Sequence, residues 1–483
     1  MSSIDEIKQA RLKKLELLKQ AGVNPFPSKV ARDIDLLQFK QDFDTLENSQ
    51  KQISLAGRIM TIRGQGAILF VVLFDGSERL QAVFKKDEMD EKLFDLFTNT
   101  ADMGDFVSVT GIAGKTKTGE PSIFVRNWQM ATKSLLPLPE KWAGLVDDDT
   151  RYRKRYLDLL VNTELRELLI KKTKFWDVAR KFFKDRGFLE VETPTLEVTT
   201  GGAEARPFRT HHNDFDIDLF LRISVGELWQ KRLMAAGFAK TFEIGRVYRN
   251  EGSSPEHLQE FTNLEFYWSF ADYHDGMNLV KELYIEIARE VFGRTDFEYK
   301  GHKFDLSQEW REIDYTEEIK KQTGTDINLA SEEEIKSKLK ELGVKWEGDN
   351  KERLTDTLWK YCRKNIAGPA FLVNHPVIVA PLAKVAEAGR TTQVFQPIIA
   401  GSEMGKGYSE LNDPIDQKER FEAQKKLLEA GDEEAMMSDF EFVEMLEHGM
   451  PPTCGFGFGE RLFAVLANKP LRELQTFPLM RPK

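Results

Sequence analysis

Apolar and polar residues alternate with a period of two along residues 242–270, which predicts two β-strands joined by a charged, turn-rich loop. Side chains point alternately to the two faces of a strand, so the second strand predicts one apolar face and one polar face. The apolar row is Thr262, Leu264, Phe266, Trp268 and Phe270, and the opposite row is Phe261, Asn263, Glu265, Tyr267 and Ser269. We expect the first row to lie on a core and the second to face a site.

Charged groups gather on the polar face of these two strands. Arg249 follows the first strand in register with Glu243 and Val247, and the loop contributes Glu251 and His257. Cations and carboxylates bind phosphates and amines, and an aromatic ring stacks on a base. The segment therefore predicts a site for a nucleotide and an amino acid.

Before this segment, the pattern predicts a helix followed by a small barrel. Ser3 and Glu6 form a capping box at the start of a helix that Gly22 ends. Five short β-type runs follow, separated by glycine-containing turns, and they predict a small closed barrel. The runs are 53–62, 68–73, 80–84, 106–112 and 122–130, and a proline-containing linker follows at 135–139.

Beyond the linker, helical and strand patterns alternate. Residues 165–186 predict a helix closed by Gly187, and residues 188–196 predict a strand broken at Pro194. The remaining elements are a helical insert at 331–365 that opens on a capping box of Ser331 and Glu334, a glycine-interrupted strand at 398–411, helices around 417–429 and 433–447, and a glycine-rich segment at 454–462.

The composition narrows the class of protein. A chain of 483 residues, 41% hydrophobic and 31% charged, is long enough for two or three cores and predicts a soluble globular protein. The sequence shows no apolar run of membrane-spanning length and no signal-peptide pattern, so we expect no membrane partner. Two cysteines, Cys362 and Cys454, are too few for a disulfide framework, which favours the cytoplasm.

The net charge of −10 is only weak evidence against a nucleic-acid partner, because binding depends on local patches. The first twenty residues are rich in lysine and arginine, whereas residues 429–447 are acidic. The basic start predicts either a solvated helix face or a surface that contacts RNA, and both interpretations stay open.

Three segments resemble the sequence motifs of class II aminoacyl-tRNA synthetases. Residues 187–196 are similar to motif 1, residues 242–270 to motif 2 and residues 455–462 to motif 3. Further segments resemble the lysyl-tRNA synthetases, in order along nearly the whole chain. These segments are 11–15, 24–27, 151–159, 201–208, 410–414 and 447–452.

The resemblance implies an α+β fold, in which an N-terminal OB-fold β-barrel precedes a class II synthetase catalytic domain with an antiparallel sheet flanked by helices. It also implies a homodimer that forms through the motif 1 region. The expected domains are an N-terminal helical extension at 1–50, an OB-fold anticodon-binding domain at 51–135, a linker at 136–150 and a catalytic domain at 151–483 with a helical insert near 305–370.

The implied reaction is ATP-dependent activation of L-lysine to lysyl-adenylate, followed by transfer to the 3′ end of tRNA(Lys). Such a reaction depends on positioning and charge stabilisation. By similarity, Arg249 is the catalytic cation on the α-phosphate and the substrate carboxylate, and Arg461 is the one on the γ-phosphate. The implied ATP-binding residues are Arg249, Glu251, His257, Phe261, Glu403 and Arg461, with Phe261 stacked on adenine, and the implied Mg²⁺ ligands are Glu403 and Glu410.

Lysine selectivity requires carboxylates for the ε-ammonium group and an aromatic wall for the methylenes. The residues at the matching family positions are Gly202, Glu227, Glu265, Tyr267, Tyr408 and Glu410. On the barrel, Phe70 and Gln81 match positions that stack on and hydrogen-bond to anticodon uridines, and Arg63 matches one that contacts the RNA backbone or a base.

Three positions depart from the family pattern. Gln396 stands where much of the family has an Mg²⁺-binding carboxylate, and Lys406 stands where the common pattern has asparagine beside the substrate. An unpaired ammonium group there would oppose binding of the substrate ammonium. We therefore expect Lys406 to be turned away or paired with a carboxylate, with Glu227 as the candidate. The motif 3 turn before Arg461 is one residue shorter than the usual form.

Strand parity sets a further condition on the predicted strand at 398–411. Glu403 and Glu410 are an odd number of positions apart, so a regular strand would point them to opposite faces. A bulge at Gly405 and Gly407 would bring both side chains to one site.

Two other interpretations of the function stay open. Aspartyl- and asparaginyl-tRNA synthetases have the same layout, but their substrates require a cationic pocket where Glu265 and Glu410 stand. A catalytically silent or regulatory tRNA-binding paralogue belongs to a different class, and intact Arg249, Glu251 and Arg461 argue against it. A lysyltransferase that resembles only the catalytic half would lack the barrel.

Overall fold

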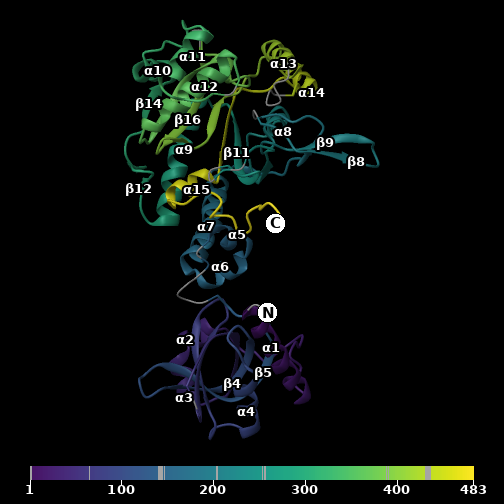
Figure 1. Cartoon of the computed structure of the whole chain (residues 1–483). Coiled ribbons are helices and arrows are strands. Elements are labelled where there is room, and N and C mark those ends of the chain that lie inside the picture. Colours follow the sequence, from purple (N-terminus) through teal and green to yellow (C-terminus); the bar gives the residue numbers. More distant parts are fainter. Residues whose placement is uncertain are drawn as a thin grey trace. The chain divides into compact units, whose positions relative to one another are not determined.

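The computed structural model describes residues 3–64, 66–139, 145, 147–202, 205–252, 254, 257–346, 348–387, 389, 391–429 and 437–483. The chain divides into two compact units, Met1–Asp147 and Asp148–Lys483 (Figure 1). Among the described residues, no helix combines the length and the apolar character needed to cross a membrane.

The first unit contains a closed barrel with strand order β1-β2-β3-β5-β4. Its interior is filled by alternate residues, as β2 shows, where Leu69, Val71 and Leu73 are buried and Ile68 and Phe70 are exposed. The strands are β1 (Ile53–Arg63), β2 (Ile68–Phe74), β3 (Arg79–Lys85), β4 (Phe106–Lys115) and β5 (Pro121–Thr132). The prediction of a small closed barrel is confirmed.

Four helices accompany the barrel, and the sequence pattern predicted only the first of them. They are α1 (Ser3–Gln20), α2 (Leu36–Gln41), α3 (Phe43–Ser49) and α4 (Glu91–Thr100). Helix α4 begins after Asp90, whose side chain caps Leu93 N, and the Phe97 ring stacks on Phe84 with centroids 4.1 Å apart. The helix thus closes one end of the barrel core.

Part of the basic start of α1 is used to attach this helix to its own unit. Arg11 is buried and donates hydrogen bonds to Ser134 Oγ at 2.6 Å and to Met103 O at 3.0 Å. Lys14 Nζ lies 2.6 Å from Asp102 Oδ1. These two cations have internal partners and do not contribute to a free basic surface.

The second unit is built on a nine-stranded sheet with strand order β14-β15-β16-β18-β19-β11-β10-β6, in which β17 also pairs with β16. The pairs β14–β15 and β6–β10 are parallel and the others are antiparallel. The strands are β6 (Leu189–Glu190), β10 (Lys240–Tyr248), β11 (Glu260–Ser269), β14 (Arg311–Asp314), β15 (Ala370–Pro376), β16 (Thr391–Ile399), β17 (Ser402–Glu403), β18 (Lys406–Ser409) and β19 (Thr453–Gly459).

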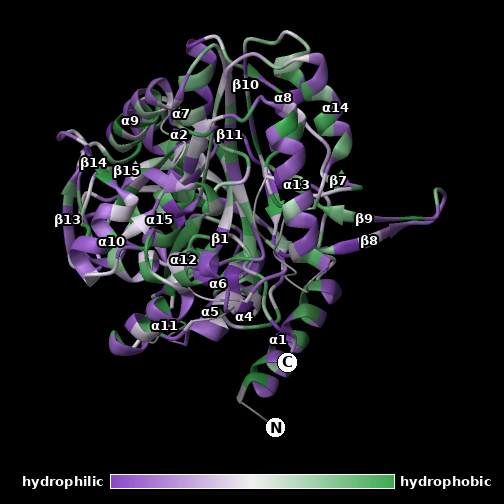
Figure 2. Cartoon of the chain, turned by 90° about the horizontal axis from the view of Figure 1, so that it is seen from above, coloured by the Kyte–Doolittle hydropathy of each residue, from purple (hydrophilic) through white to green (hydrophobic). Residues whose placement is uncertain are grey.

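Two smaller sheets accompany the large one. One has the order β7-β9-β8 and the other pairs β12 with β13. Their strands are β7 (Leu196–Glu197), β8 (Arg209–His212), β9 (Ile217–Leu221), β12 (Asp296–Tyr299) and β13 (His302–Asp305). Figure 2 shows β8 and β9 as a hairpin that extends beyond the helices of its own unit.

Helices cover both faces of the large sheet. Figure 2 shows α7 and α9 on one side of β10 and β11, and α8, α13 and α14 on the other. The helices are α5 (Asp148–Arg153), α6 (Arg155–Val161), α7 (Thr163–Asp185), α8 (Glu227–Ala235), α9 (Tyr273–Ile287), α10 (Tyr315–Thr323), α11 (Glu332–Glu341), α12 (Lys351–Cys362), α13 (Pro414–Glu429), α14 (Phe440–His448) and α15 (Arg461–Leu466), with a π-helix at Ala288–Phe292 and 3₁₀ turns at Arg363–Asn365 and Val377–Val379.

The alternation along β11 distributes its residues as predicted, with one exception. Leu264 and Phe266 belong to the aromatic-rich core under α7 and α9, where Phe183 stacks on Phe242 at 5.2 Å. Phe270, predicted to lie on the core, is 82% exposed. It comes after the end of β11 and takes a positive φ of 61°, which turns its side chain out of the strand pattern.

Two other predicted boundaries need correction. The strand expected at 188–196 is present only as β6 and β7, which join different sheets on either side of Pro194. The second late helix begins at Phe440 rather than near residue 433, and residues 430–436 lie outside the described residues. The capping box of Ser331 and Glu334 is confirmed at the start of α11.

The glycine-interrupted segment at 398–411 is a hairpin rather than one strand. The chain reverses at Ala400 and Gly401, after which Glu403 pairs with Ile398 and Gly407 pairs with Phe395. Between these two pairs the chain advances four residues, from Glu403 to Gly407, but only three residues on β16, from Phe395 to Ile398. The segment from Glu403 to Gly407 therefore contains one extra residue. The predicted bulge is therefore present, and Gly405 within it takes a φ of 136°.

Candidate active site

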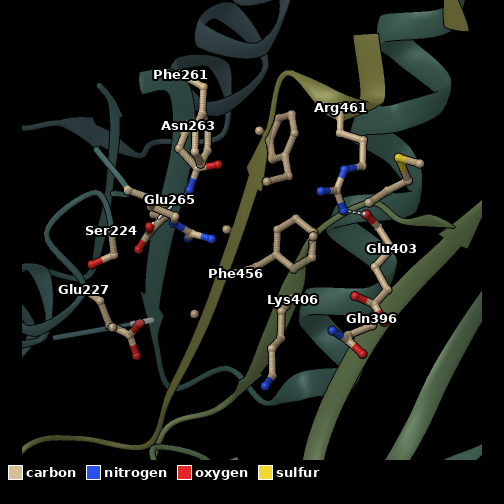
Figure 3. Close-up of a pocket in the computed structure, with 18 of the residues that line it drawn as sticks. Ser224, Glu227, Phe261, Asn263, Glu265, Gln396, Glu403, Lys406, Phe456 and Arg461 are labelled. Carbon is tan, nitrogen blue, oxygen red and sulfur yellow. Dashed lines mark hydrogen bonds between the residues drawn. The ribbon is translucent and has the colours of Figure 1, made fainter. Parts of the chain in front are cut away.

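A cavity of about 370 Å³ opens on the polar face of β11, β19 and β18 (Figure 3). Every residue that the sequence predicted for the ATP and lysine sites lies in its lining. These residues are Gly202, Glu227, Arg249, Glu251, His257, Phe261, Glu265, Tyr267, Glu403, Tyr408, Glu410 and Arg461. The lining also contains Ser224 and Asn263, which had not been selected as site residues.

The floor of the cavity depends on three glycines of β19, because side chains from β11 and from Glu410 lie over them. A Cβ atom on Gly455 would lie 2.1 Å from Glu410 Oε1, and one on Gly457 would lie 2.9 Å from Glu265 Cγ. A Cβ atom on Gly459 would lie 2.9 Å from the side-chain oxygen of Asn263. The glycine-rich pattern of motif 3 therefore creates the space in which the carboxylates converge.

The strand register places the predicted residues in rows across this floor. Glu265, Gly457 and Lys406 form one row across β11, β19 and β18. Tyr267, Gly455 and Tyr408 form the next row. Each tyrosine thus has a counterpart across the glycine strand, and the pair can bracket an aliphatic chain between them.

Glu265 is buried and its carboxylate is held in place from several sides. Its Oε1 accepts hydrogen bonds from Val225 N at 2.7 Å and from the Asn263 amide at 3.2 Å, and its Oε2 accepts one from the Tyr267 hydroxyl at 3.2 Å. Burial and the neighbouring charge of Glu227 raise the pKa of Glu265 to about 7. Among the described residues, no lysine or arginine forms an ion pair with Glu265, although Arg249 interacts with it electrostatically over a longer distance.

Lys231 of α8 links two more carboxylates at the inner end of the cavity. Its Nζ lies 2.8 Å from Glu227 Oε1 and 2.5 Å from Glu410 Oε2, and its side chain is 1% exposed. The Tyr408 hydroxyl also donates to Glu227 Oε1. Burial raises the pKa of Glu410, and Lys231 opposes this shift.

Sequence reasoning had missed Lys231. The one local signal was its position four residues after Glu227, which places both side chains on the same face of α8. Its contact with Glu410 depends on tertiary packing. Two of the three buried carboxylates, Glu227 and Glu410, thus share the buried Lys231 ammonium group, and the third, Glu265, forms no ion pair among the described residues. The cavity is therefore suited to a ligand that carries additional positive charge.

Backbone geometry helps to position α8 against the cavity. Gly226 precedes the helix with a φ of 65°, and a Cβ atom there would lie 2.1 Å from Thr193 Oγ1. Gly202 also has a positive φ, and a Cβ atom there would lie 2.6 Å from Glu227 Oε2. The absence of a Cβ atom on Gly202 therefore leaves room for the Glu227 carboxylate, and the backbone contact of Gly202 with lysine stays a prediction.

The outer part of the cavity brings together the cation and the ring that motif 2 predicted. The Arg249 guanidinium lies 5.4 Å from the centre of the Phe261 ring, and its Nε and Nη2 are each 3.3 Å from Ile223 O. Burial lowers the pKa of Arg249, and Glu251 acts against this shift. Within the part of the chain that the structure describes, Arg249 forms no ion pair with a carboxylate, so its guanidinium is available for an anionic ligand.

Motif 3 places Arg461 at the start of α15, opposite Glu403 in Figure 3. Arg461 Nη1 donates to the Glu403 backbone oxygen at 3.4 Å, and the Trp359 indole donates to Glu403 Oε1 at 2.8 Å. Burial alone would raise the pKa of Glu403, but Arg363, this indole and Arg461 together lower it. Glu403 is therefore an anion beside two arginines.

Lys406 is not paired with Glu227, and that hypothesis was wrong. Glu227 is bound to Lys231, whereas Lys406 Nζ donates to Val379 O at 3.1 Å. Figure 3 shows the Lys406 side chain running away from the Glu265 carboxylate. The alternative expectation, that the Lys406 side chain is turned away from the site of the substrate ammonium group, is confirmed.

The barrel surface carries the three residues predicted to contact RNA. Arg63 and Phe70 are cross-strand partners on β1 and β2, and both are exposed. Gln81 faces Val72 on the neighbouring strand and donates to Ser122 Oγ at 3.0 Å. Arg63, Phe70 and Gln81 therefore share one outer face of the barrel, and their contact with RNA stays a prediction.

Two family profiles match the chain and agree with its two units. The profile described as tRNA synthetases class II (D, K and N) matches residues 147–481, and the profile described as OB-fold nucleic acid binding domain matches residues 53–131. These matches confirm the predicted α+β fold with an N-terminal OB-fold barrel and a class II catalytic domain.

Proteins named Lysine--tRNA ligase align with almost the whole chain. The one from Thermotoga maritima is 42% identical over 99% of this chain and 97% of its own length. Those from Halalkalibacterium halodurans and Moorella thermoacetica are 43% and 42% identical, each over 99% of this chain and 98% of its own length. The chain therefore belongs to the class II tRNA synthetases of the D, K and N type, within the lysine–tRNA ligase family.

Proposed function

We infer that the protein activates L-lysine with ATP and transfers the lysyl group to the 3′ end of tRNA(Lys). The observation that carries this function is the charge of the inner cavity, where three carboxylates are buried and the described ion pairs give a single ammonium group, Lys231, to two of them. Lysine brings two ammonium groups, one at each end of an aliphatic chain. An anionic substrate such as aspartate would instead add a further negative charge to this cavity.

The geometry supports a separate role for each end of lysine. Glu265 and Glu410, with Tyr267 between them, are the partners for the ε-ammonium group, and the two tyrosines flank the methylenes. Glu227 is the partner for the α-ammonium group, beside the backbone of Gly202. Lysine binding thus supplies a cation to Glu265 and further positive charge to Glu227 and Glu410, which share Lys231.

Activation requires the lysine carboxylate to attack the α-phosphorus of ATP while pyrophosphate leaves. Arg249 is proposed to hold the lysine carboxylate and the α-phosphate, because its guanidinium lies over the Phe261 ring and interacts electrostatically with Glu251 and Glu265. Phe261 offers a ring face for adenine, with Glu251 and His257 beside it, and Arg461 is the cation for the γ-phosphate. These groups act by positioning and charge stabilisation.

Mg²⁺ supplies additional charge neutralisation when it is bound to the ATP phosphates. Glu403 fits the role of a ligand, because its carboxylate lines the cavity and its pKa is lowered. Glu410 is occupied by Lys231 in this structure, and its role as a second ligand stays a prediction.

Two further roles follow from the same family. Arg63, Phe70 and Gln81 are proposed to read the anticodon of tRNA(Lys), in the cytoplasm where tRNA is charged. A homodimer is proposed to form through the motif 1 region, where Leu189 and Leu196 are each 49% exposed and Val198 is 66% exposed. Sedimentation of the purified protein at several concentrations tests the dimer.

The test of the main function is ATP–pyrophosphate exchange measured with each amino acid in turn. Lysine-dependent exchange is the expected result, with little exchange for aspartate or asparagine. Exchange with aspartate or asparagine instead of lysine would show that the cavity selects another substrate. Absence of exchange with every amino acid, in a protein that binds tRNA, would show a silent paralogue.

A further inference from the structure

Gln396, His375 and Lys406 form a polar corner of the active-site cavity that the roles above do not use. Gln396 and Lys406 both line the cavity. They lie on neighbouring strands, one position along from the Phe395–Gly407 pair, so their backbones are about one strand spacing, or 5 Å, apart. Both face the side of the sheet on which Glu265 and Glu403 lie (Figure 3).

The oxygen of Gln396 is already engaged by His375. His375 Nε2 lies 2.8 Å from Gln396 Oε1, and burial and Lys406 lower the pKa of His375 to about 3. The ring is therefore neutral at physiological pH, and its Nε2–H donates to the glutamine oxygen. Figure 3 shows the Gln396 amide nitrogen on the side of Lys406 and the oxygen on the opposite side. Gln396 thus offers an N–H donor to the cavity.

Few oxygen atoms in this corner are available as ligands for a metal ion, because the Gln396 oxygen already accepts from His375. Glu403 is the anion on this side of the cavity, and its Oε1 already accepts from Trp359. The corner combines an amide donor and an ammonium group, which are suited to phosphate oxygens rather than to a cation.

Lys406 has unused hydrogen-bonding capacity. Its ammonium group has three N–H donors, and the described structure gives it one acceptor, Val379 O at 3.1 Å. No carboxylate among the described residues lies within ion-pair distance of it. A flexible lysine with one neutral acceptor can turn toward an anion that enters the cavity, because little is lost when that single bond breaks.

We propose that Lys406 is a phosphate-binding residue that, with the amide of Gln396, supplies charge neutralisation which a metal ion would otherwise supply to the ATP polyphosphate. This inference rests on the proposed ATP-dependent function. It explains the composition of the corner, where the described side chains are an amide, a neutral imidazole ring and an ammonium group with no carboxylate within ion-pair distance. This composition favours a bare polyphosphate over a second metal ion.

The experiment measures nucleotide affinity and metal stoichiometry. The probe is an ATP analogue with a methylene group between the α- and β-phosphorus atoms, titrated in the presence of Mn²⁺, with free Mn²⁺ counted by electron paramagnetic resonance. The variants are Lys406→Met, Gln396→Glu and the double change Gln396→Glu with Lys406→Asn. Lys384→Met is the matched control, since Lys384 donates to Asn412 and does not line the cavity.

Lys406→Met is expected to weaken analogue binding about 10- to 100-fold, the effect of losing one charged hydrogen bond. The double variant is expected to bind one more Mn²⁺ per active site than the wild type and to regain much of the affinity. Lys384→Met is expected to match the wild type. Circular dichroism of each variant during heating shows whether its fold is retained.

Two results would overturn the proposal. Unchanged analogue affinity in a folded Lys406→Met protein would show that the ammonium does not contact phosphate. An unchanged Mn²⁺ count in the double variant would show that these positions do not set the metal stoichiometry. Failure of the wild-type protein to bind the analogue at all would instead overturn the proposed ATP-dependent function, and this inference with it.

Discussion

Lys231 and Glu410 form a buried ion pair, with 2.5 Å between Nζ and Oε2 and a side-chain exposure of 1% for each residue. Lys231 also pairs with Glu227, so one ammonium group stabilises two carboxylates in the wall of the lysine cavity. The pair places positive charge where the substrate ε-ammonium would compete with it for Glu410. The cavity thus stays folded without lysine and still has carboxylates to offer when lysine arrives.

Lys231→Met should strongly destabilise the protein. Removal of one partner leaves Glu227 and Glu410 buried without a cation, and such losses cost about 3–5 kcal/mol of unfolding free energy. The measurement is urea unfolding at pH 8 followed by circular dichroism. Lys181→Met is the matched control, because Lys181 pairs with Asp185 on an exposed helix face and should have little effect. Equal stability of the two variants would contradict the prediction.

Lysine binding should weaken as the pH falls through 7. The pKa of Glu265 is raised to about 7 in the empty cavity, so its carboxyl group is largely protonated below that pH. The lysine ammonium requires the ionised form, so binding releases a proton, and affinity should fall about tenfold for each pH unit below 7. Calorimetric titration with lysine between pH 6 and pH 8.5 measures both the affinity and the proton release.

Glu265→Gln is the control for this pH dependence. The glutamine amide cannot ionise, so the change of lysine affinity near pH 7 should disappear. Most of the affinity for lysine should be lost as well. A wild-type affinity that stays constant from pH 6 to pH 8.5 would show that Glu265 is ionised in the empty cavity, contrary to the expectation.

Local pattern was enough to predict the residues of motif 2. Phe261, Glu265 and Tyr267 lie on one strand, so a period of two in the sequence placed all of them on one face before any tertiary structure was known. The bulge near Gly405 was predicted from the parity of Glu403 and Glu410, once the resemblance had placed both residues in one site. These features depend on neighbours in the chain, which is why sequence reasoning reached them.

The features that were missed depend on tertiary contacts or on unusual backbone. Lys231 meets Glu410 only when α8 packs against the end of β18, and no spacing in the sequence reports that contact. The reversal before β17 occurs at Ala400 and Gly401, and Ala400 takes a φ of 49° that alanine rarely adopts, so Gly401 was interpreted as an interruption within one strand. Phe270 was assigned to the core because the alternation continued through it, although the strand ends one residue earlier.

Alanine at two glycines of β19 should affect the two substrates separately. A Cβ atom on Gly455 meets Glu410 and Tyr267, so Gly455→Ala should raise the KM for lysine more than tenfold, as expected for displaced buried groups. A Cβ atom on Gly459 meets Asn263 and Phe261, so Gly459→Ala should mainly raise the KM for ATP. ATP–pyrophosphate exchange, with the concentrations of lysine and ATP varied in turn, measures both KM values. Equal effects on the two constants would contradict the assignment of the two ends of the cavity.

Phe70→Ala on the barrel should impair tRNA charging and leave amino-acid activation intact. The Phe70 ring is 36% exposed beside Arg63, where a splayed base can stack on it, and such stacking contributes about 1–3 kcal/mol per base. The expected loss in kcat/KM for tRNA(Lys) is therefore about 5- to 150-fold, with unchanged ATP–pyrophosphate exchange. Ile68→Ala is the matched control, because Ile68 is 40% exposed on the same face of β2 but has no aromatic ring. If Ile68→Ala reduced charging as much as Phe70→Ala, the loss would come from the shape of the strand, and Phe70 would have no specific part in recognising the anticodon.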